Sequence, residues 1–89
     1  MLNREIEITN QLGLHARASA KVTRLAGQFS SEVFLARDGR KVNAKSVLGV
    51  MMLAAGKGSK VAIEVNGSDE GEAMQALVHL IERNLGQGE

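Results

Sequence analysis

The sequence predicts a two-layer α+β domain in which helices cover one face of a four-stranded antiparallel sheet and solvent covers the other. Segments with period-2 and period-3.6 apolar spacing alternate in the order strand, helix, strand, strand, helix, strand, helix. With 89 residues, the chain has room for one domain, 1–89, and one small core. The strand segments carry hydrophilic residues at alternate positions, which is typical of a sheet with one wet face. These residues are Glu5, Glu7, Glu32 and Glu64.

The first strand and the first helix are separated by a short turn. The strand is predicted over residues 2–9, although Arg4 interrupts its apolar face, and a turn over 10–14 follows. Residues 16–26 then show helical spacing, and Gly27 stands where helices commonly end. The residues predicted to face the core are Leu2, Ile6 and Ile8 in the strand and Ala18, Val22, Leu25 and Ala26 in the helix.

A β-hairpin is predicted in the middle of the chain. Its strands cover 31–37 and 40–43, and Asp38-Gly39 between them is a favoured pair for a two-residue hairpin turn. Phe29, just before the hairpin, is predicted to anchor the chain on the core. The residues of the first strand that face inward are Val33 and Leu35.

The helix predicted over 46–53 carries more apolar residues than one buried face needs. Ser46 is a favoured N-cap residue, and the helix is expected to end before Ala54. Because a helix of about two turns buries only one side, we expect some of its apolar side chains to be exposed as a docking surface. The candidates are Val47, Leu48, Met51 and Met52. The pattern alone equally allows all four to be buried in a strand or core helix.

One more strand and one more helix complete the predicted fold. The strand, with Val61, Ile63 and Val65 alternating, follows a turn over 56–58 and ends at Asn66-Gly67. The helix is predicted to begin at Asp69, with Glu72 at capping-box spacing, and to run to Leu85. Its predicted buried stripe is Ala73, Leu77, Leu80, Ile81 and Leu85. Residues 86–89 are predicted to be a frayed tail.

Composition excludes several kinds of site. The chain has no cysteine, which excludes disulfides, thiol chemistry and thiolate metal sites. The 11 basic and 10 acidic residues form no long block of one sign, so no nucleic-acid surface is predicted. The sequence shows no metal-ligand cluster and no nucleotide-binding glycine loop, so no cofactor is expected. We expect a cytoplasmic protein, because the first residues lack a signal-peptide core and no apolar run is long enough to span a membrane.

The stretch Gly13-Leu14-His15-Ala16-Arg17 is the strongest candidate for chemistry. His15 falls at a strand-to-helix junction, where the first helix amides lack intrahelical acceptors and attract an anion. A histidine can act as a nucleophile toward phosphorus because its pKa lies near neutrality, and Arg17 adds forked donors that match phosphate oxygens. Taken alone, the pair is also compatible with a polar surface position that has no chemical role.

A second motif strengthens the functional interpretation. Residues 42–51 read Val42-Asn43-Ala44-Lys45-Ser46-Val47-Leu48-Gly49-Val50-Met51. Together with the motif around His15, it resembles the HPr family, the small histidine phosphocarriers of the bacterial phosphotransferase system. Length and element order match as well, so the resemblance covers essentially the whole chain. It implies an open-faced sandwich with strand order 1-4-2-3.

The resemblance implies a role for each matching residue. His15 would accept a phosphoryl group on Nδ1 from phosphorylated Enzyme I, itself charged by phosphoenolpyruvate, and pass it to a histidine of an EIIA component. The chain would thus be a transiently phosphorylated carrier and not an independent enzyme. Arg17 would stabilise the phosphoryl group, and Ser46 would be a regulatory site for a bifunctional HPr kinase/phosphorylase. The implied docking residues are Ala16, Ala20, Val47, Leu48 and Met51. We expect a monomer, since a carrier must expose the same surface to successive partners.

Ser46 combines a structural and a regulatory interpretation. A phosphate there would add about two negative charges at a helix N-terminus, which favours the local helix. The same charge would lie beside the docking surface and is expected to weaken Enzyme I binding without unfolding the domain. The serine is also suited to act as an N-cap alone.

The chain departs from the family pattern at Ala18, where many members have proline; alanine is a good helix former, so we expect little change in chemistry. Because the tail extends past Leu85, a contact between a chain-terminal carboxylate and the active site is not carried over. His79 is expected to be an exposed helix residue.

Two alternatives to a sugar-transport carrier stay open. One is a nitrogen-related phosphocarrier that serves a regulatory EIIA. The other is a sheet-based interaction or RNA-binding module, which calls for exposed aromatic residues, whereas this chain has only Phe29 and Phe34.

Overall fold

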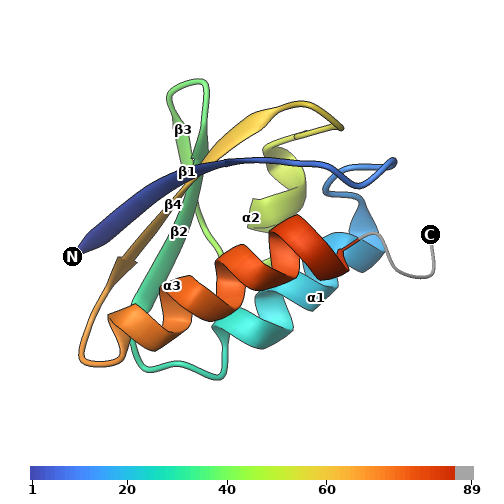
Figure 1. The fold of residues 1–89 in the computed structure, drawn as a ribbon. Helices are drawn as coiled ribbons and strands as arrows, with labels where there is room; N and C mark the ends of the chain where they lie inside the picture. The colour runs from blue at the N-terminus through green and yellow to red at the C-terminus, as the bar shows by residue number, and fades with distance from the viewer. Residues whose placement is uncertain (86–89) are drawn as a thin grey trace.

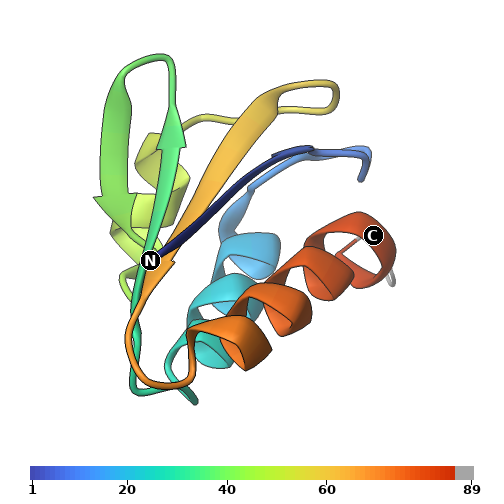
Figure 2. The ribbon, with the colours of Figure 1, turned by 60° about the vertical axis from the view of Figure 1, so that its left-hand side comes forward.

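The computed structural model describes residues 1–85 and confirms the predicted order of elements. A four-stranded antiparallel sheet with strand order β1-β4-β2-β3 is covered on one side by the helices (Figures 1 and 2). This is also the strand order that the family resemblance implies. The strands are β1 (Leu2–Glu7), β2 (Glu32–Arg37), β3 (Arg40–Asn43) and β4 (Lys60–Asn66). The helices are α1 (Ala16–Ala26), α2 (Val47–Met52) and α3 (Glu70–His79), and a π-helical stretch η1 (Leu80–Asn84) continues α3.

β1 ends two residues earlier than the sequence predicts, although the chain stays paired. Ile8 N donates to Ser59 O at 2.9 Å, and Gly58 N donates to Ile8 O at 2.8 Å. After Glu7 the chain is therefore hydrogen-bonded to the turn before β4 and not to a strand. Ile6 and Ile8 are buried as expected, whereas Leu2 is 38% exposed. Only the second half of the predicted apolar face therefore belongs to the core.

α1 has the predicted bounds and the predicted buried face. Ala18, Val22 and Ala26 are fully buried, and Leu25 packs against the core from its edge. Gly27 ends the helix with a right-handed φ of −66°, so its freedom to adopt a left-handed conformation is not used here. A neighbouring prediction also holds, since Phe29 is half-buried against the core.

The β2–β3 hairpin turns at the two residues that the sequence indicates. Asp38 has φ 51° and Gly39 has φ 81°, and this pair of positive values matches the right-handed twist of the flanking strands. Val33 and Leu35 face the core and are fully buried. The hairpin therefore has the register that the alternating pattern predicts.

The core lies between the sheet and the helices, which Figure 2 shows on one side of the strands. The predicted inward residues of β4 and of the last helix belong to it, with Leu80 partly buried at its edge. Met74 and Val78 are also buried, although the helical spacing did not single them out. The opposite face of the sheet is wet, as expected: Glu5, Glu7 and Glu32 are exposed. Glu64 is half-buried, and Lys41 Nζ binds its carboxylate at 2.9 Å.

The predicted capping box at the start of α3 is wrong. The Asp69 carboxylate does not cap the helix; it accepts hydrogen bonds from Ser30 N at 2.8 Å, Ser31 N at 2.9 Å and the Ser31 hydroxyl. Glu70, and not Glu72, reaches back and accepts from Gly67 N at 3.1 Å. Because the Ser31 amide is held by Asp69, β2 begins at Glu32 and not at the predicted residue 31.

Within residues 1–85, no helix is long and apolar enough to cross a membrane. The predicted frayed tail, 86–89, lies outside the described residues.

Candidate functional site

A tightly fitted loop places His15 at the start of α1. Gly13 has φ +67°, and a Cβ added to it would lie 2.3 Å from Ala55 O, so only glycine fits here. The next residue is fixed by a hydrogen bond from Leu14 N to Ala55 O at 2.8 Å. Asn10 Nδ2 closes the loop by donating to Gly13 O at 2.8 Å. His15 is therefore presented from a backbone that packing holds in place.

The His15 side chain caps the helix that it precedes. It is the N-cap residue, with an extended backbone, and its Nδ1 accepts a hydrogen bond from Arg17 N at 3.3 Å. In this geometry the Nδ1 lone pair faces the Arg17 amide at the helix N-terminus. This distance is longer than the roughly 2.9 to 3.0 Å that is usual between an N–H donor and its acceptor, so the bond is weak. The Arg17 amide is thus engaged by the histidine itself, a contact that the sequence did not predict.

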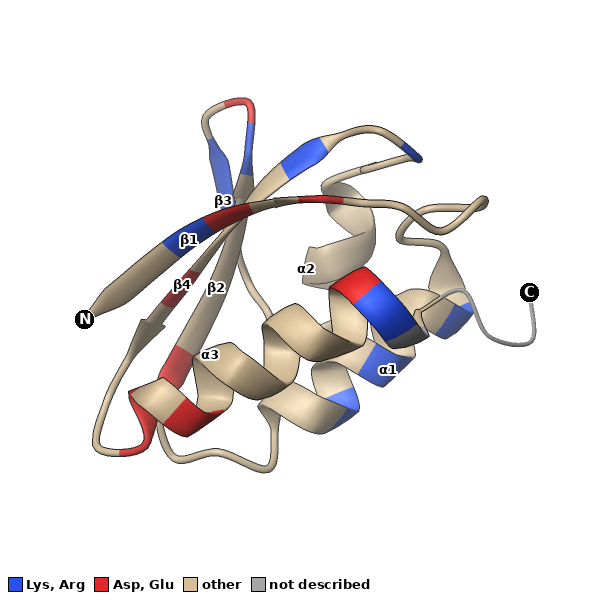
Figure 3. Ribbon diagram, viewed as in Figure 1, with Lys and Arg blue, Asp and Glu red and all other residues tan. Residues whose placement is uncertain are grey.

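The charged side chains of α1 near His15 are basic. The first turn of α1, which the structure describes in full, contains no acidic residue. Figure 3 shows basic residues along α1 and acidic residues at the start of α3. Ala16 and Arg17 are exposed and Ala20 is half-buried, so this end of the helix can be reached from solvent.

Ser46 occupies the equivalent position in α2. Its hydroxyl accepts from Gly49 N at 3.1 Å, which confirms the predicted N-cap. The preceding turn is also closed, since Asn43 Oδ1 accepts from Lys45 N at 2.8 Å. α1 and α2 pack against each other, so the helices that begin after His15 and Ser46 are neighbours.

α2 exposes the apolar side chains that the sequence singled out. Leu48 is 73% exposed, Met52 60% and Met51 38%, whereas Val47 is half-buried. The alternative in which all four are buried is therefore wrong. Only Val50 of this helix is fully buried, because a helix of six residues turns one side to the core.

Sequence reasoning missed a further exposed apolar residue. Leu12, in the loop just before His15, is 63% exposed. The sequence could have indicated this exposure. An apolar residue in a turn between a strand and a helix belongs to no strand or helix face that packs on the core.

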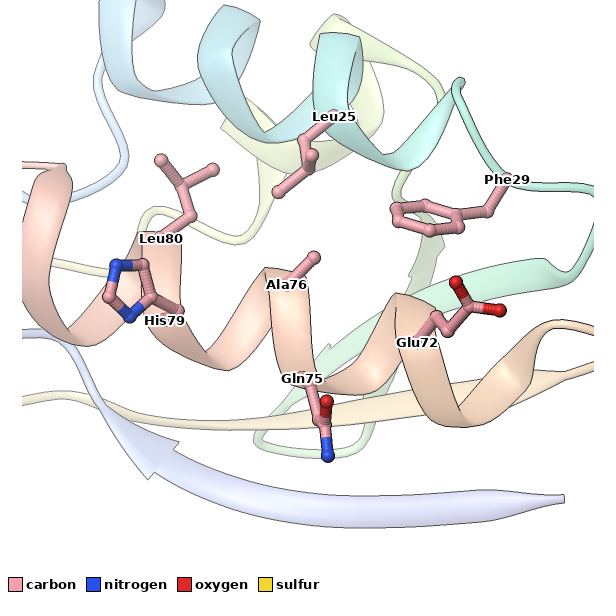
Figure 4. Close-up of a pocket in the computed structure, with 7 residues that line it drawn as sticks. All are labelled: Leu25, Phe29, Glu72, Gln75, Ala76, His79 and Leu80. Carbon is pink, nitrogen blue, oxygen red and sulfur yellow. The ribbon is translucent and has the colours of Figure 1, made fainter.

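The hollow between α1 and α3 contains neither His15 nor Ser46 (Figure 4). It has a volume of about 700 Å³ and is lined by Leu25, Phe29, Glu72, Gln75, Ala76, His79 and Leu80. His79 is exposed on α3, as predicted. The candidate nucleophile thus lies on an open helix end and not in this groove. Among residues 1–85, no group of three or more His, Asp or Glu side chains could hold a metal ion.

These features define a class of small α+β proteins that present a half-buried histidine at a helix N-terminus beside an exposed apolar surface. The family model described as the PTS HPr component phosphorylation site matches residues 2–83. The chain therefore belongs to the HPr family of phosphocarrier proteins of the phosphotransferase system.

Individual relatives agree with this assignment. The chain is 61% identical over 89 residues to the phosphocarrier protein HPr of Cupriavidus necator, with full coverage of both chains. Its structure is similar to that of an HPr protein from Thermoanaerobacter tengcongensis, with a TM-score of 0.94, 44% identity and full coverage of both chains. It also matches an HPr dimer from that organism, with a TM-score of 0.78 and 45% identity over 98% of this chain and 100% of the other. The monomer expected here stays a prediction.

The two aromatic residues of the chain do not support the RNA-binding alternative. That interpretation needs exposed aromatic rings for base stacking. Phe29 and Phe34 are both half-buried, and Lys41 Nζ lies 4.6 Å from the centroid of the Phe34 ring.

Proposed function

We propose that this chain accepts a phosphoryl group on Nδ1 of His15 from phosphorylated Enzyme I and transfers it to a histidine of an EIIA component. The observation that carries the proposal is the placement of Nδ1 beside the Arg17 amide at the N-terminus of α1, because this puts a backbone donor next to the ring nitrogen that would attack phosphorus. In each transfer one N–P bond forms as another breaks, so the phosphoryl group moves between proteins without water.

The helix N-terminus supplies stabilisation at the moment when Nδ1 becomes bonded to phosphorus. The Arg17 amide then loses its acceptor on the ring and can donate to a phosphoryl oxygen instead. The positive end of the α1 dipole favours the same negative charge, and the first turn contributes no carboxylate that would repel it. The Arg17 side chain adds a positive charge two residues after His15, in the role that the family resemblance implies.

A carrier must release its phosphoryl group as readily as it accepts it. Weak, partial compensation by one amide and one arginine suits this requirement better than a deep, closed site would. His15 is half-buried, but the next two residues, Ala16 and Arg17, are exposed, so a donor and an acceptor protein would approach this helix end in turn. This is the arrangement expected of a carrier in a sugar-uptake phosphotransferase chain located in the cytoplasm.

The exposed apolar side chains of α2 give these partners a surface to bind. Leu48 and Met51 are exposed on α2, which packs against α1, and Met side chains adapt to more than one partner. Together with Ala16, Ala20 and Val47, they form the proposed docking surface.

The first test is transfer of label from phosphoenolpyruvate with Enzyme I and Mg²⁺. The wild-type chain should acquire an acid-labile, base-stable label, and His15→Ala should acquire none. The matched control is His79→Ala, which removes the other of the two histidines and should label like wild type. An unlabelled wild-type chain beside an active, cognate Enzyme I would contradict the carrier function.

The second half of the proposal is tested with the acceptors. Labelled chain is offered to an EIIA of a sugar transporter and to a regulatory EIIA of the nitrogen branch. Faster transfer to the sugar EIIA supports the proposed function, and faster transfer to the regulatory EIIA replaces it with the nitrogen-related alternative. The presence of Ser46 in its motif favours the sugar branch.

We further propose that Ser46 is a regulatory phosphorylation site of an HPr kinase/phosphorylase. Its hydroxyl caps α2, and a phosphate there would place about two negative charges at the helix N-terminus, beside the exposed Leu48. The helix should persist while Enzyme I binds more weakly. Unchanged transfer from Enzyme I to a stoichiometrically Ser46-phosphorylated sample would contradict this role.

A further inference from the structure

Two arginines face each other across the β2–β3 hairpin. Arg37, the last residue of β2, pairs with Arg40, the first residue of β3, on either side of the turn. Figure 3 shows an acidic segment at the tip of this hairpin with basic segments on both sides. Like charges directly opposite in an antiparallel pair are destabilising, so this arrangement needs a compensating interaction.

The C-terminus of α2 provides part of that compensation. Arg37 Nη1 donates to Leu53 O at 2.9 Å, and Arg40 Nη1 donates to Met52 O at 3.1 Å. Both bonds satisfy carbonyls at the negative end of the helix dipole. They also hold the two guanidinium groups in fixed positions, which lowers the entropy cost of binding a further ligand.

The two side chains line a pocket that is separate from the His15 site. Its volume is about 270 Å³, and its lining is Arg37, Asp38, Arg40, Met52, Leu53 and Ala54. Each guanidinium has five N–H donors, and a carbonyl occupies one of them, so donors remain for a ligand in the pocket. The wall includes Ala54, whose φ of 52° is unusual for a residue other than glycine.

Charge in the pocket is positive despite its acidic neighbour. Asp38 Oδ2 lies 3.8 Å from Arg37 Nη2, but the Asp38 side chain is 82% exposed and that of Arg37 is 31% exposed. A contact this open is weak in water. Two guanidinium groups against one solvated carboxylate leave an excess of one positive charge, before the partial negative charge of the helix end is counted.

We propose that this pocket binds a phosphate group, either as free phosphate or as a small phosphate monoester. The forked donors of arginine match phosphate oxygens, and an anion between Arg37 and Arg40 would relieve their mutual repulsion. The volume suits a small ligand and lies below that of typical drug-sized sites, roughly 300 to 1,000 Å³, so a nucleotide is not expected. The inference does not depend on phosphoryl transfer by His15.

The test is a titration of the ¹⁵N-labelled full chain with inorganic phosphate or with glucose 6-phosphate, at constant ionic strength set with sodium chloride. The Nε–Hε signals of Arg37 and Arg40 should shift and reach saturation. Tighter binding of the ester assigns a phosphorylated metabolite, and equal binding assigns free phosphate; both outcomes support the site. A shift that grows linearly, or that sodium chloride reproduces, would overturn the proposal.

Charge variants sharpen the test in both directions. Arg40→Gln should weaken binding by about three- to fivefold, the range expected for an exposed charge pair. Asp38→Asn should tighten binding by about two- to threefold, because it removes the repelling carboxylate and asparagine tolerates the positive φ of this position.

The controls separate this pocket from other basic positions. Arg4→Gln makes the same charge change on β1, at the opposite edge of the sheet, and should leave the affinity unchanged. Arg17→Gln, at the start of α1, should not change the saturation curve of the Arg37 and Arg40 signals. Loss of saturation in Arg17→Gln, or failure of Asp38→Asn to tighten binding, would overturn the proposal.

Discussion

The N-termini of α1 and α3 both leave backbone amides without intrahelical acceptors, but the side chains around them carry opposite charges. α3 begins with acidic residues: Asp69 binds Ser30 and Ser31, and Glu70 binds Gly67 N and the Met1 ammonium at 3.1 Å. α1 begins with His15 and Arg17 and has no acidic residue in its first turn. Figure 3 shows this contrast between the two neighbouring helices.

The difference in charge separates a structural role for the N-terminus of α3 from a proposed chemical role for that of α1. Acidic side chains near a helix N-terminus are stabilising because of the dipole and the amides without intrahelical acceptors. At α3, Asp69 joins the helix to the residues just before β2, and Glu70 joins it to Gly67 and Met1, so this helix end is a structural joint. At α1 the cap is the His15 ring, so under the proposed carrier function the same physical attraction for negative charge would serve a phosphoryl group.

The largest effect should come from giving α1 an acidic first turn like that of α3. Arg17→Glu is expected to reduce the initial rate of label transfer from Enzyme I by about 100-fold, since it replaces a stabilising charge with a repelling one. The melting temperature should be nearly unchanged, because an acidic residue suits a helix N-terminus. Arg4→Glu, with the same charge change on β1, is the control. Retention of the wild-type rate in Arg17→Glu would contradict the role assigned to Arg17.

A large effect on stability is expected at the joint before α3. Gly67 has φ +158°, and an added Cβ would lie 2.6 Å from Ser31 Cα, so Gly67→Ala should destabilise the fold by about 2 to 3 kcal/mol. The control is Gly71→Ala, where a Cβ meets open space within a helix and should stabilise by about 0.5 to 1 kcal/mol. Urea denaturation measures both. Equal stabilities of the two variants would show that the joint is not tightly packed.

An intermediate effect is expected at the third helix N-terminus, that of α2. Ser46→Ala should cost about 1 kcal/mol of unfolding free energy, because the bond to Gly49 N is lost, while phosphoryl transfer continues. Ser46→Asp keeps a good cap but adds a negative charge, so it should preserve stability and weaken Enzyme I binding. Titration calorimetry with Enzyme I checks the second result. Equal affinities of the two variants would reduce Ser46 to a cap alone.

The smallest effect should be the acid sensitivity of the α3 joint. The hydrogen bond from the Ser31 hydroxyl, followed by the bond from Ser30 N, lowers the pKa of Asp69 below its usual 3.8. The bond from Gly67 N, followed by the Met1 ammonium, lowers the pKa of Glu70 below 4.5. Depressed folded-state values mean that this stability is present above these ordinary values and is lost as the pH falls through the lower, folded ones.

Denaturation measured at a series of acidic pH values checks this expectation. Asp69→Asn should be less stable than wild type near neutrality, and the difference should shrink as the pH falls below 3.8. A constant difference across this range would show that the Asp69 charge contributes no pH-dependent stability.

Local patterns in the sequence were sufficient to predict most of the fold and the two helix N-termini at which His15 and Ser46 lie. Alternation in 31–37 and the Asp38-Gly39 pair specify a hairpin because strand faces and turn dihedrals depend on neighbouring residues. The same holds for His15 and Ser46, since an N-cap is defined by its place before a helical pattern. The strand order, in contrast, came from resemblance to a family and not from the pattern.

What the sequence alone determined is therefore the type and order of the elements, the wet face of the sheet, and the two capped helices that carry His15 and Ser46. Tertiary structure alone decided which polar groups meet across long separations. Asp69 has the spacing of a helix cap, yet it binds Ser31, which is 38 residues away in the chain. Arg37 and Arg40 show no motif, yet packing of α2 under the hairpin brings both to its carbonyl end. Local propensity favours a cap by only about 1 kcal/mol, so a better set of hydrogen bonds offered by a distant segment prevails once the chain has packed.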